Sequence, residues 1–217
     1  MCFLESLRAP TSRQYFGVCM MPIAWKQWWT APTNTALGRV EPAATMSAHP
    51  SLVEWKKLRF VIMDAPKANN LHLYIRELKK QNVVCVVRVC EPTYPASEVE
   101  AAGMKLLEME YDDGGAPPVE IINKWLNVVK TTFHNAPDSS GPNGSEGPTI
   151  AVHCVAGLGR APVLVAIALI EYGKDPIKAV EYIRDRRRGA INRKQLSYLD
   201  SYERRSSGNS CSSCVVM

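Results

Sequence analysis

The chain has 217 residues, 46% of them hydrophobic, and a formal net charge of +5. This length is enough for one domain with a sizeable core and less regular ends. The longest apolar run, at residues 161–170, is too short to cross a bilayer, so a membrane-spanning protein is not expected. The positive charge suits an anionic partner without choosing between phosphorylated molecules, membranes and nucleic acids.

Residues 1–45 differ from the rest of the chain. They are rich in Pro, Thr and Ala, poor in acidic residues, and follow no regular period, so we expect an irregular, disordered extension. A secretory signal is not predicted, because a basic start and an uninterrupted apolar core are both missing. A transit peptide and a translation start at Met46 stay open as alternatives, and the start at Met46 is favoured.

Regular patterning predicts one domain over residues 46–205. In chain order, it predicts a strand at 58–63, a helix at 70–81, a buried strand at 83–89, a short strand at 105–109 and a helix at 119–133. After a Gly- and Ser-rich loop at 134–148, a strand at 149–152 precedes helices at 162–172, 176–187 and 192–204, and then a flexible tail at 206–217. This alternation predicts an α/β fold whose mostly parallel central sheet is flanked by helices on both faces.

The cysteines give no sign of a scaffold or a metal site. Their number, seven, is odd, and no His/Cys cluster of zinc type occurs, so a reducing compartment fits the chain better than a disulfide framework. We therefore expect no metal, and each cysteine is judged by its own surroundings.

Cys154 follows the strand at 149–152, at the sheet edge where α/β folds bind ligands. The six residues after it, here named the phosphate loop, are Val155, Ala156, Gly157, Leu158, Gly159 and Arg160. The glycines allow backbone N–H groups to point at an anion, and Arg160 can offer a planar fork to two phosphate oxygens. The same field favours a Cys154 thiolate, which can attack phosphorus and form a phosphocysteine. The alternative is a buried structural cysteine before a helix.

This segment resembles the active-site loop of protein tyrosine phosphatases. More closely, HCVAGLGRAPVLV at 153–165, VRVCEPTY at 87–94, YDDGGAPP at 111–118 and RRGAINRKQL at 187–196 are similar to the phosphatases of regenerating liver, the prenylated PRL or type IVA family. The resemblance covers roughly residues 50–205. It implies a dual-specificity-like phosphatase fold, a tyrosine-phosphorylated protein as substrate, and no cofactor.

Hydrolysis of a phosphate ester also needs a proton donor for the leaving oxygen. The resemblance implies Asp113 as this general acid and Asp112 as its structural neighbour. The sequence has Gly114 and Gly115 where the family has one glycine, so Asp112 stays an alternative. A simple turn with two solvated acids is a further alternative.

Four more residues near these motifs have expected roles. Ala161 stands where many tyrosine phosphatases have a hydroxyl, so we expect slow breakdown of the phosphocysteine and low turnover. The resemblance implies a redox disulfide between Cys90 and Cys154, although Cys90 could also be a small buried hydrophobe. His153 either orients the loop or is a core histidine, and Gln195 could position water.

The last four residues, CVVM, form a prenylation box at Cys214 in which the final Met favours farnesyl. One lipid chain binds membranes only marginally, so a second signal is expected. Its candidates are Arg184, Arg186, Arg187, Arg188, Arg204 and Arg205, although the family has a denser basic run before the box. We expect the protein at the cytoplasmic face of the plasma membrane or endomembranes, with a cytosolic fraction.

A binding module that keeps the phosphatase site as a docking pocket is the second interpretation. The resemblance implies CNNM-type magnesium transport mediators as partners, and Ala161 favours this interpretation through slow turnover. Nucleic-acid binding through the arginines at 184–188 is not expected, because no aromatic platform accompanies them. The sequence leaves a homo-oligomer open.

Overall fold

The computed structural model describes residues 45–134 and 147–205. The elements in chain order are β1 (Ser51–Trp55), β2 (Leu58–Met63), α1 (Leu71–Lys80), β3 (Val83–Arg88), α2 (Ala96–Ala101), β4 (Lys105–Glu108), α3 (Val119–Phe133), β5 (Thr149–His153), α4 (Arg160–Glu171), α5 (Pro176–Arg186) and α6 (Arg193–Asp200). The predicted extension and tail, and nearly all of the predicted loop at 134–148, lie outside the described residues.

The strands form one five-stranded sheet in the order β1-β2-β5-β3-β4. Strands β2, β5, β3 and β4 are parallel neighbours, and only the edge strand β1 runs antiparallel, paired with β2 from Ser51↔Ile62 to Trp55↔Leu58. Every residue of β2 and β5 is buried, which explains their nearly continuous apolar sequences. The predicted mostly parallel sheet is confirmed, and β5 lies at its centre.

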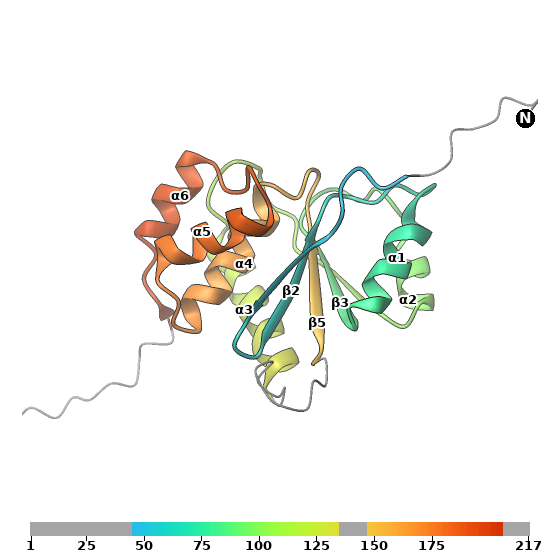
Figure 1. Cartoon of the computed structure of the whole chain (residues 1–217), viewed down its shortest axis with the longest axis horizontal. Helices are drawn as coiled ribbons and strands as arrows, with labels where there is room; N and C mark the ends of the chain where they lie inside the picture. The colour runs from blue at the N-terminus through green and yellow to red at the C-terminus, as the bar shows by residue number, and fades with distance from the viewer. Residues whose placement is uncertain (1–44, 135–146, 206–217) are drawn as a thin grey trace, which may run out of the picture. The chain divides into compact units, whose positions relative to one another are not determined.

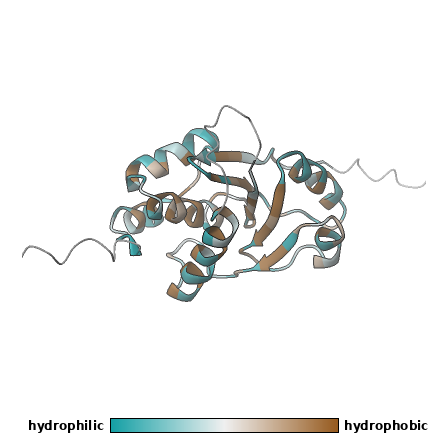
Figure 2. Ribbon diagram, turned by 90° about the horizontal axis from the view of Figure 1, so that it is seen from below, coloured by the Kyte–Doolittle hydropathy of each residue, from teal (hydrophilic) through white to brown (hydrophobic). Residues whose placement is uncertain are grey.

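Helices cover both faces of the sheet, as the alternating pattern predicted (Figure 1). Helices α3 to α6 pack on one face around Phe60, Trp125 and Phe133, and every residue of α4 is buried. Helices α1 and α2 pack on the other face around Leu71 and Tyr74. Figure 2 shows the strands largely brown and the outer helices banded with teal, so the apolar side chains gather between the layers.

Two elements were not predicted, and some predicted boundaries were wrong. Strand β1 is only partly buried and α2 has six residues, so neither carries a strong periodic pattern. Helix α4 begins at Arg160 and not at 162, because the phosphate loop itself turns into the first helical residues. Helix α6 ends at Asp200 and not at 204.

His153 closes β5 inside the core and contacts no solvent. Its Nε2 atom lies 2.6 Å from the hydroxyl oxygen of Tyr94, whose ring is tilted against the imidazole. Burial lowers the pKa of His153 to about 4, and the nearby charge of Arg88 adds to this effect, while the backbone of Cys154 opposes it. The structure therefore places His153 as a neutral core histidine bonded to Tyr94.

This burial predicts a pH-dependent stability. The pKa of His153 is lower in the folded protein, so the unfolded chain binds the extra proton and stability falls as pH drops below about 6.5. Between pH 7 and pH 5 we expect a loss of about 2 kcal/mol from this group in urea unfolding. The variant His153→Asn should show a smaller loss over the same interval, and an equal loss in both proteins would contradict the assignment.

Candidate active site

Cys154 directly follows β5, where the sheet presents the carboxyl ends of its parallel strands. The N–H group of Val89 donates to the carbonyl oxygen of His153 at 3.0 Å, so the pairing of β3 with β5 continues to this point. Cys154 is 2% exposed and lines a cavity of about 270 Å³. The residues that line this cavity are Asp113, Gly114, Cys154, Ala156, Leu158, Gly159, Gly189, Asn192 and Gln195.

The phosphate loop turns its carbonyl groups away from this cavity. Four successive carbonyl oxygens accept hydrogen bonds from outside the loop: Val155 from Ala65 N at 2.9 Å, Ala156 and Gly157 from Arg187 at 2.9 and 2.7 Å, and Leu158 from Ile191 N at 2.7 Å. In a trans peptide the N–H group points opposite to the carbonyl group. The N–H groups of residues 156–159 therefore point inward, and none of them has a partner in the described part of the chain. Such a ring of free donors is an anion site.

Gly157 is required by this geometry. Its φ angle is +68°, and a Cβ atom there would lie 2.4 Å from the carbonyl oxygen of Met63 and 2.6 Å from Nη2 of Arg187. Any side chain would displace the strand end or the guanidinium that holds the loop.

Arg160 is the first residue of α4 and is held by Tyr111. The Tyr111 hydroxyl donates to the carbonyl oxygen of Arg160 at 2.8 Å, and Nη1 of Arg160 donates to the Tyr111 carbonyl oxygen at 3.2 Å. Nε of Arg160 lies 3.7 Å from Oδ1 of Asp113. The guanidinium is thus fixed beside the cavity, next to an exposed carboxylate.

Asp113 lines the cavity, whereas Asp112 does not. An added Cβ at Gly159 would lie 2.8 Å from Oδ1 of Asp113, so the carboxylate contacts the phosphate loop closely. The adjoining backbone is tied to α6, because Nδ2 of Asn192 donates to the carbonyl oxygen of Gly114 at 3.3 Å.

Gln195 forms a capping box with Asn192 at the start of α6. Its Oε1 accepts from Asn192 N at 3.1 Å, which leaves Nε2 buried without a partner in the described residues. This amide group would lie 3.4 Å from a Cβ at Gly159, so it is a free donor at the wall of the cavity. A phosphate oxygen or a water molecule would satisfy it.

Cys90 follows the end of β3, the strand next to β5, and is 2% exposed. Burial raises the pKa of its thiol to about 11, while the charge of Arg160 opposes this and that of Cys154 adds to it. Cys90 and Cys154 are both free thiols in this structure, in the same buried cluster.

Three residues that support the site were not predicted in this role. Tyr111 holds Arg160, Asn192 holds the acid loop, and Arg187 holds the phosphate loop. Arg187 was considered as a lipid contact, and this interpretation is wrong because the residue is only 7% exposed. Its neighbour Arg184 donates to the carbonyl oxygens of residues 190 and 191 and so also has a structural role.

Two classes of site are not seen within residues 45–134 and 147–205. No group of three or more His, Cys, Asp or Glu side chains is arranged to hold a metal ion there. No helix among these residues has the length and apolar character needed to cross a membrane.

Comparison with known proteins gives a consistent result. The chain is 50% identical over 167 residues to a probable protein tyrosine phosphatase type IVA A of Dictyostelium discoideum, with 77% of this chain and 93% of the relative covered. It is 48% identical to the PRL-1 phosphatase of Drosophila melanogaster (71% and 82% covered) and 46% identical to the mouse protein tyrosine phosphatase type IVA 2 (70% and 86% covered).

Among solved structures, a putative protein tyrosine phosphatase from Leishmania major matches with a TM-score of 0.63 and 38% identity, over 72% of this chain and all of that one. The kinase-associated phosphatase, at 20% identity and a TM-score of 0.54, shares the fold over 70% of this chain and 91% of its own. No protein-family model matches the chain. The identities and coverage of the curated relatives show that this chain belongs to the PRL, or type IVA, protein tyrosine phosphatases.

Proposed function

We propose that the chain hydrolyses phosphate monoesters of tyrosine-phosphorylated proteins through a phosphocysteine on Cys154. The observation that carries this proposal is the ring of inward-pointing N–H groups beside the buried Cys154. The ring forms because the carbonyl groups of the phosphate loop accept hydrogen bonds on its outer side. A bound phosphoryl group would accept from these donors and from Arg160, with its phosphorus above the Cys154 sulfur.

The proposed reaction has two displacement steps. The Cys154 thiolate attacks phosphorus while the bond to the ester oxygen breaks, and Asp113 gives its proton to that leaving oxygen. Water then attacks the phosphocysteine, releases inorganic phosphate and returns the thiolate, while Asp113 takes back a proton. In this proposal the Nε2 group of Gln195, which is a free donor at the wall of the cavity, orients this water.

The second step is expected to be slow. Ala161 follows Arg160, is fully buried, and offers only a methyl group at the position where many tyrosine phosphatases have a hydroxyl. A hydroxyl there would stabilise the leaving thiolate by a hydrogen bond, which is worth about 1 kcal/mol, or roughly fivefold in rate. The phosphocysteine should therefore accumulate.

We further propose that Cys90 regulates the site by oxidation. Peroxide would oxidise the Cys154 thiolate to a sulfenic acid, and the Cys90 thiol would attack that sulfur. The S–O bond breaks as the S–S bond forms, and hydroxide leaves as water with the thiol proton. The burial of both thiols in one cluster supports this pairing.

Farnesylation of Cys214 is proposed to hold the protein at the cytoplasmic face of membranes, as the prenylation box implies. Cys214 lies outside the described residues. The mass of the C-terminal peptide from eukaryotic cells tests this directly, and an unmodified peptide would refute it.

A binding module for CNNM-type magnesium transport mediators is the second candidate function. It is supported by Ala161 and by the apolar rim of the phosphate loop, where Val155 and Leu158 are 57% and 37% exposed. Capture of a transporter's cytosolic domain should be lost when Cys154 is alkylated, and capture that ignores the state of Cys154 would refute docking at this site.

Replacement of the nucleophile should remove the activity. The variant Cys154→Ser should show no turnover of an aryl phosphate and no phosphate adduct by intact mass, because a serine hydroxyl is not ionised in this site. The matched control Cys85→Ala, in β3, should keep both, since Cys85 lines no part of the cavity. Adduct formation in Cys154→Ser would contradict the mechanism.

The general acid can be identified with a matched pair of variants. Asp113→Asn should lower kcat/KM for a phosphotyrosine peptide by about 100-fold, with a smaller effect on an aryl phosphate whose leaving group needs no proton. Asp112→Asn should change either value by less than about threefold, because its side chain is outside the cavity. The reverse pattern would assign the acid to Asp112. kcat/KM is the suitable constant, because slow breakdown of the adduct masks the first step in kcat.

The redox proposal predicts that Cys90→Ser keeps its turnover under reducing conditions but is no longer protected against irreversible oxidation of Cys154. After peroxide treatment, a dithiol should restore most of the activity of the chain that retains Cys90. It should restore little activity of the variant, because Cys154 of the variant is oxidised further to sulfinic acid. Peptide mapping should find the 90–154 disulfide only in the unmodified chain. Equal recovery in both proteins would argue against Cys90 as the resolving thiol.

A further inference from the structure

Asp64 is a buried carboxylate that has no role in the proposed reaction. It follows the last residue of β2 and is 6% exposed. Asp64 forms no direct ion pair with any cation in the part of the chain that the structure describes. Burying a charged carboxylate is costly unless hydrogen bonds and a nearby opposite charge compensate it. The groups around Asp64 should therefore include this compensation.

One of these groups is the hydroxyl of Tyr74, in α1. It donates to Oδ1 of Asp64 at 3.0 Å, and Tyr74 has no exposed surface. Burial raises the pKa of Tyr74 to about 12, and the hydrogen bond to Asp64 and the charge of Asp64 add to this effect, while Ser47 opposes it. The hydroxyl thus stays protonated and orients the carboxylate, but a neutral donor does not supply an opposite charge.

Arg187 lies beside the same end of β2. A Cβ atom at Gly157 would lie 2.4 Å from the carbonyl oxygen of Met63 and 2.6 Å from Nη2 of Arg187, so the strand end and the guanidinium meet at one point of the phosphate loop. Asp64 is the residue after Met63, and the N–H group of Ala65 donates to the loop at 2.9 Å. Asp64 therefore belongs to the segment that holds the loop together with Arg187.

The residues just before β1 and at its start contact both groups. Ser47 forms a hydrogen bond with Tyr74, the partner of Asp64. Four residues later, the hydroxyl oxygen of Ser51 accepts from Nη1 of Arg187 at 3.4 Å. One short segment thus spans the distance from the Tyr74–Asp64 pair to the guanidinium.

The hydrogen bonds of Arg187 do not neutralise its charge. They go to two carbonyl oxygens of the phosphate loop and to two oxygens of residues 49 and 51, and all of these acceptors are neutral. Burial lowers the pKa of Arg187, and the charges of Asp64 and then Cys154 oppose that shift. When Cys154 is a neutral thiol, Asp64 is the remaining countercharge of these two.

We propose that Asp64, oriented by Tyr74, is a positioning residue that holds the Arg187 guanidinium against the phosphate loop. Asp64 acts through Arg187, since it lines no part of the catalytic cavity. The consequence is a loop whose N–H groups are aligned before an anion binds. The inference rests on the proposed function, because it concerns the same anion site, but anion binding can be measured without turnover.

The test uses tungstate, a tetrahedral oxyanion that mimics phosphate, titrated calorimetrically into the full chain under reducing conditions. Asp64→Asn removes the charge but keeps the size and an oxygen acceptor for Tyr74. It should bind tungstate about tenfold more weakly, since two loop N–H groups lose their fixed direction, and kcat/KM for an aryl phosphate should fall by a similar factor. Tyr74→Phe keeps the charge and loses only its orientation, so it should weaken binding by about threefold.

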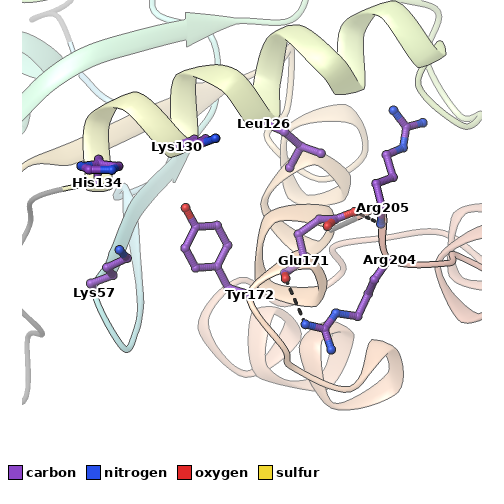
Figure 3. A pocket seen from close by; sticks show the side chains of 8 residues that line it. All are labelled: Lys57, Leu126, Lys130, His134, Glu171, Tyr172, Arg204 and Arg205. Atoms are coloured by element: carbon purple, nitrogen blue, oxygen red, sulfur yellow. Dashed lines mark hydrogen bonds between the residues drawn. The ribbon is translucent and has the colours of Figure 1, made fainter. Parts of the chain in front are cut away.

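The matched control is Glu171→Gln. Glu171 is the other buried carboxylate among the described residues, at 7% exposed, and it also accepts from a tyrosine hydroxyl, that of Tyr202, at 2.8 Å. It ends α4, opposite to the end that carries the phosphate loop, and lines a different cavity beside Tyr172 (Figure 3). This variant should lose stability in urea as Asp64→Asn does, but bind tungstate within about twofold of the unmodified chain.

A second background shows whether the effect runs through Arg187. Arg187→Lys keeps a positive charge but cannot form the paired bonds of the guanidinium to the loop. In this background, Asp64→Asn should change tungstate binding by less than about twofold, whereas independent roles would give the tenfold effect again. A general loss of packing at Asp64 would not cancel in this way.

Three outcomes would overturn the inference. Tighter tungstate binding by Asp64→Asn would mean that Asp64 only weakens the field of Arg187. Equal weakening in Asp64→Asn and Glu171→Gln would mean lost stability, and a full effect in the Arg187→Lys background would mean an independent role. The proposed function fails separately: tungstate binding that depends on Asp64, without aryl phosphate turnover, would refute hydrolysis and support the positioning role.

Discussion

The catalytic geometry depends on the buried guanidinium of Arg187. It donates to the carbonyl oxygens of Ala156 and Gly157, and so it turns two peptide units of the phosphate loop with their N–H groups toward the cavity. Removing a charge from water is costly unless its donors are satisfied. Burial lowers the pKa of Arg187, whereas the charges of Asp64 and Cys154 oppose that shift. The guanidinium of Arg187 therefore stays charged in this buried position because the loop carbonyl groups accept its hydrogen bonds and the charge of Cys154 favours its protonated form.

The other two fixed points of the loop come from equally distant segments. Ala65 follows β2 and Ile191 precedes α6, and their N–H groups hold the carbonyl oxygens of Val155 and Leu158. Helix α4, which is buried along its whole length, continues the loop and sets the position of Arg160. The anion site is thus a tertiary property, in which residues 65, 187 and 191 each fix one part of a six-residue loop. The loop's own sequence supplies only the glycines that permit it.

The contrast between the loop's own residues and the distant residues that hold it explains how much of the site could be predicted from the sequence. The strand at β5, Cys154, the glycines and Arg160 are contiguous, so their joint role was visible in the sequence, as was the α/β sheet. Local patterns carry no information on which way a distant arginine points, and for that reason Arg187 was counted among the candidate lipid contacts. The choice between Asp112 and Asp113 was equally undetermined, because an added Gly115 shifts the register of the loop, and only the packing against Gly159 shows which carboxylate lines the cavity.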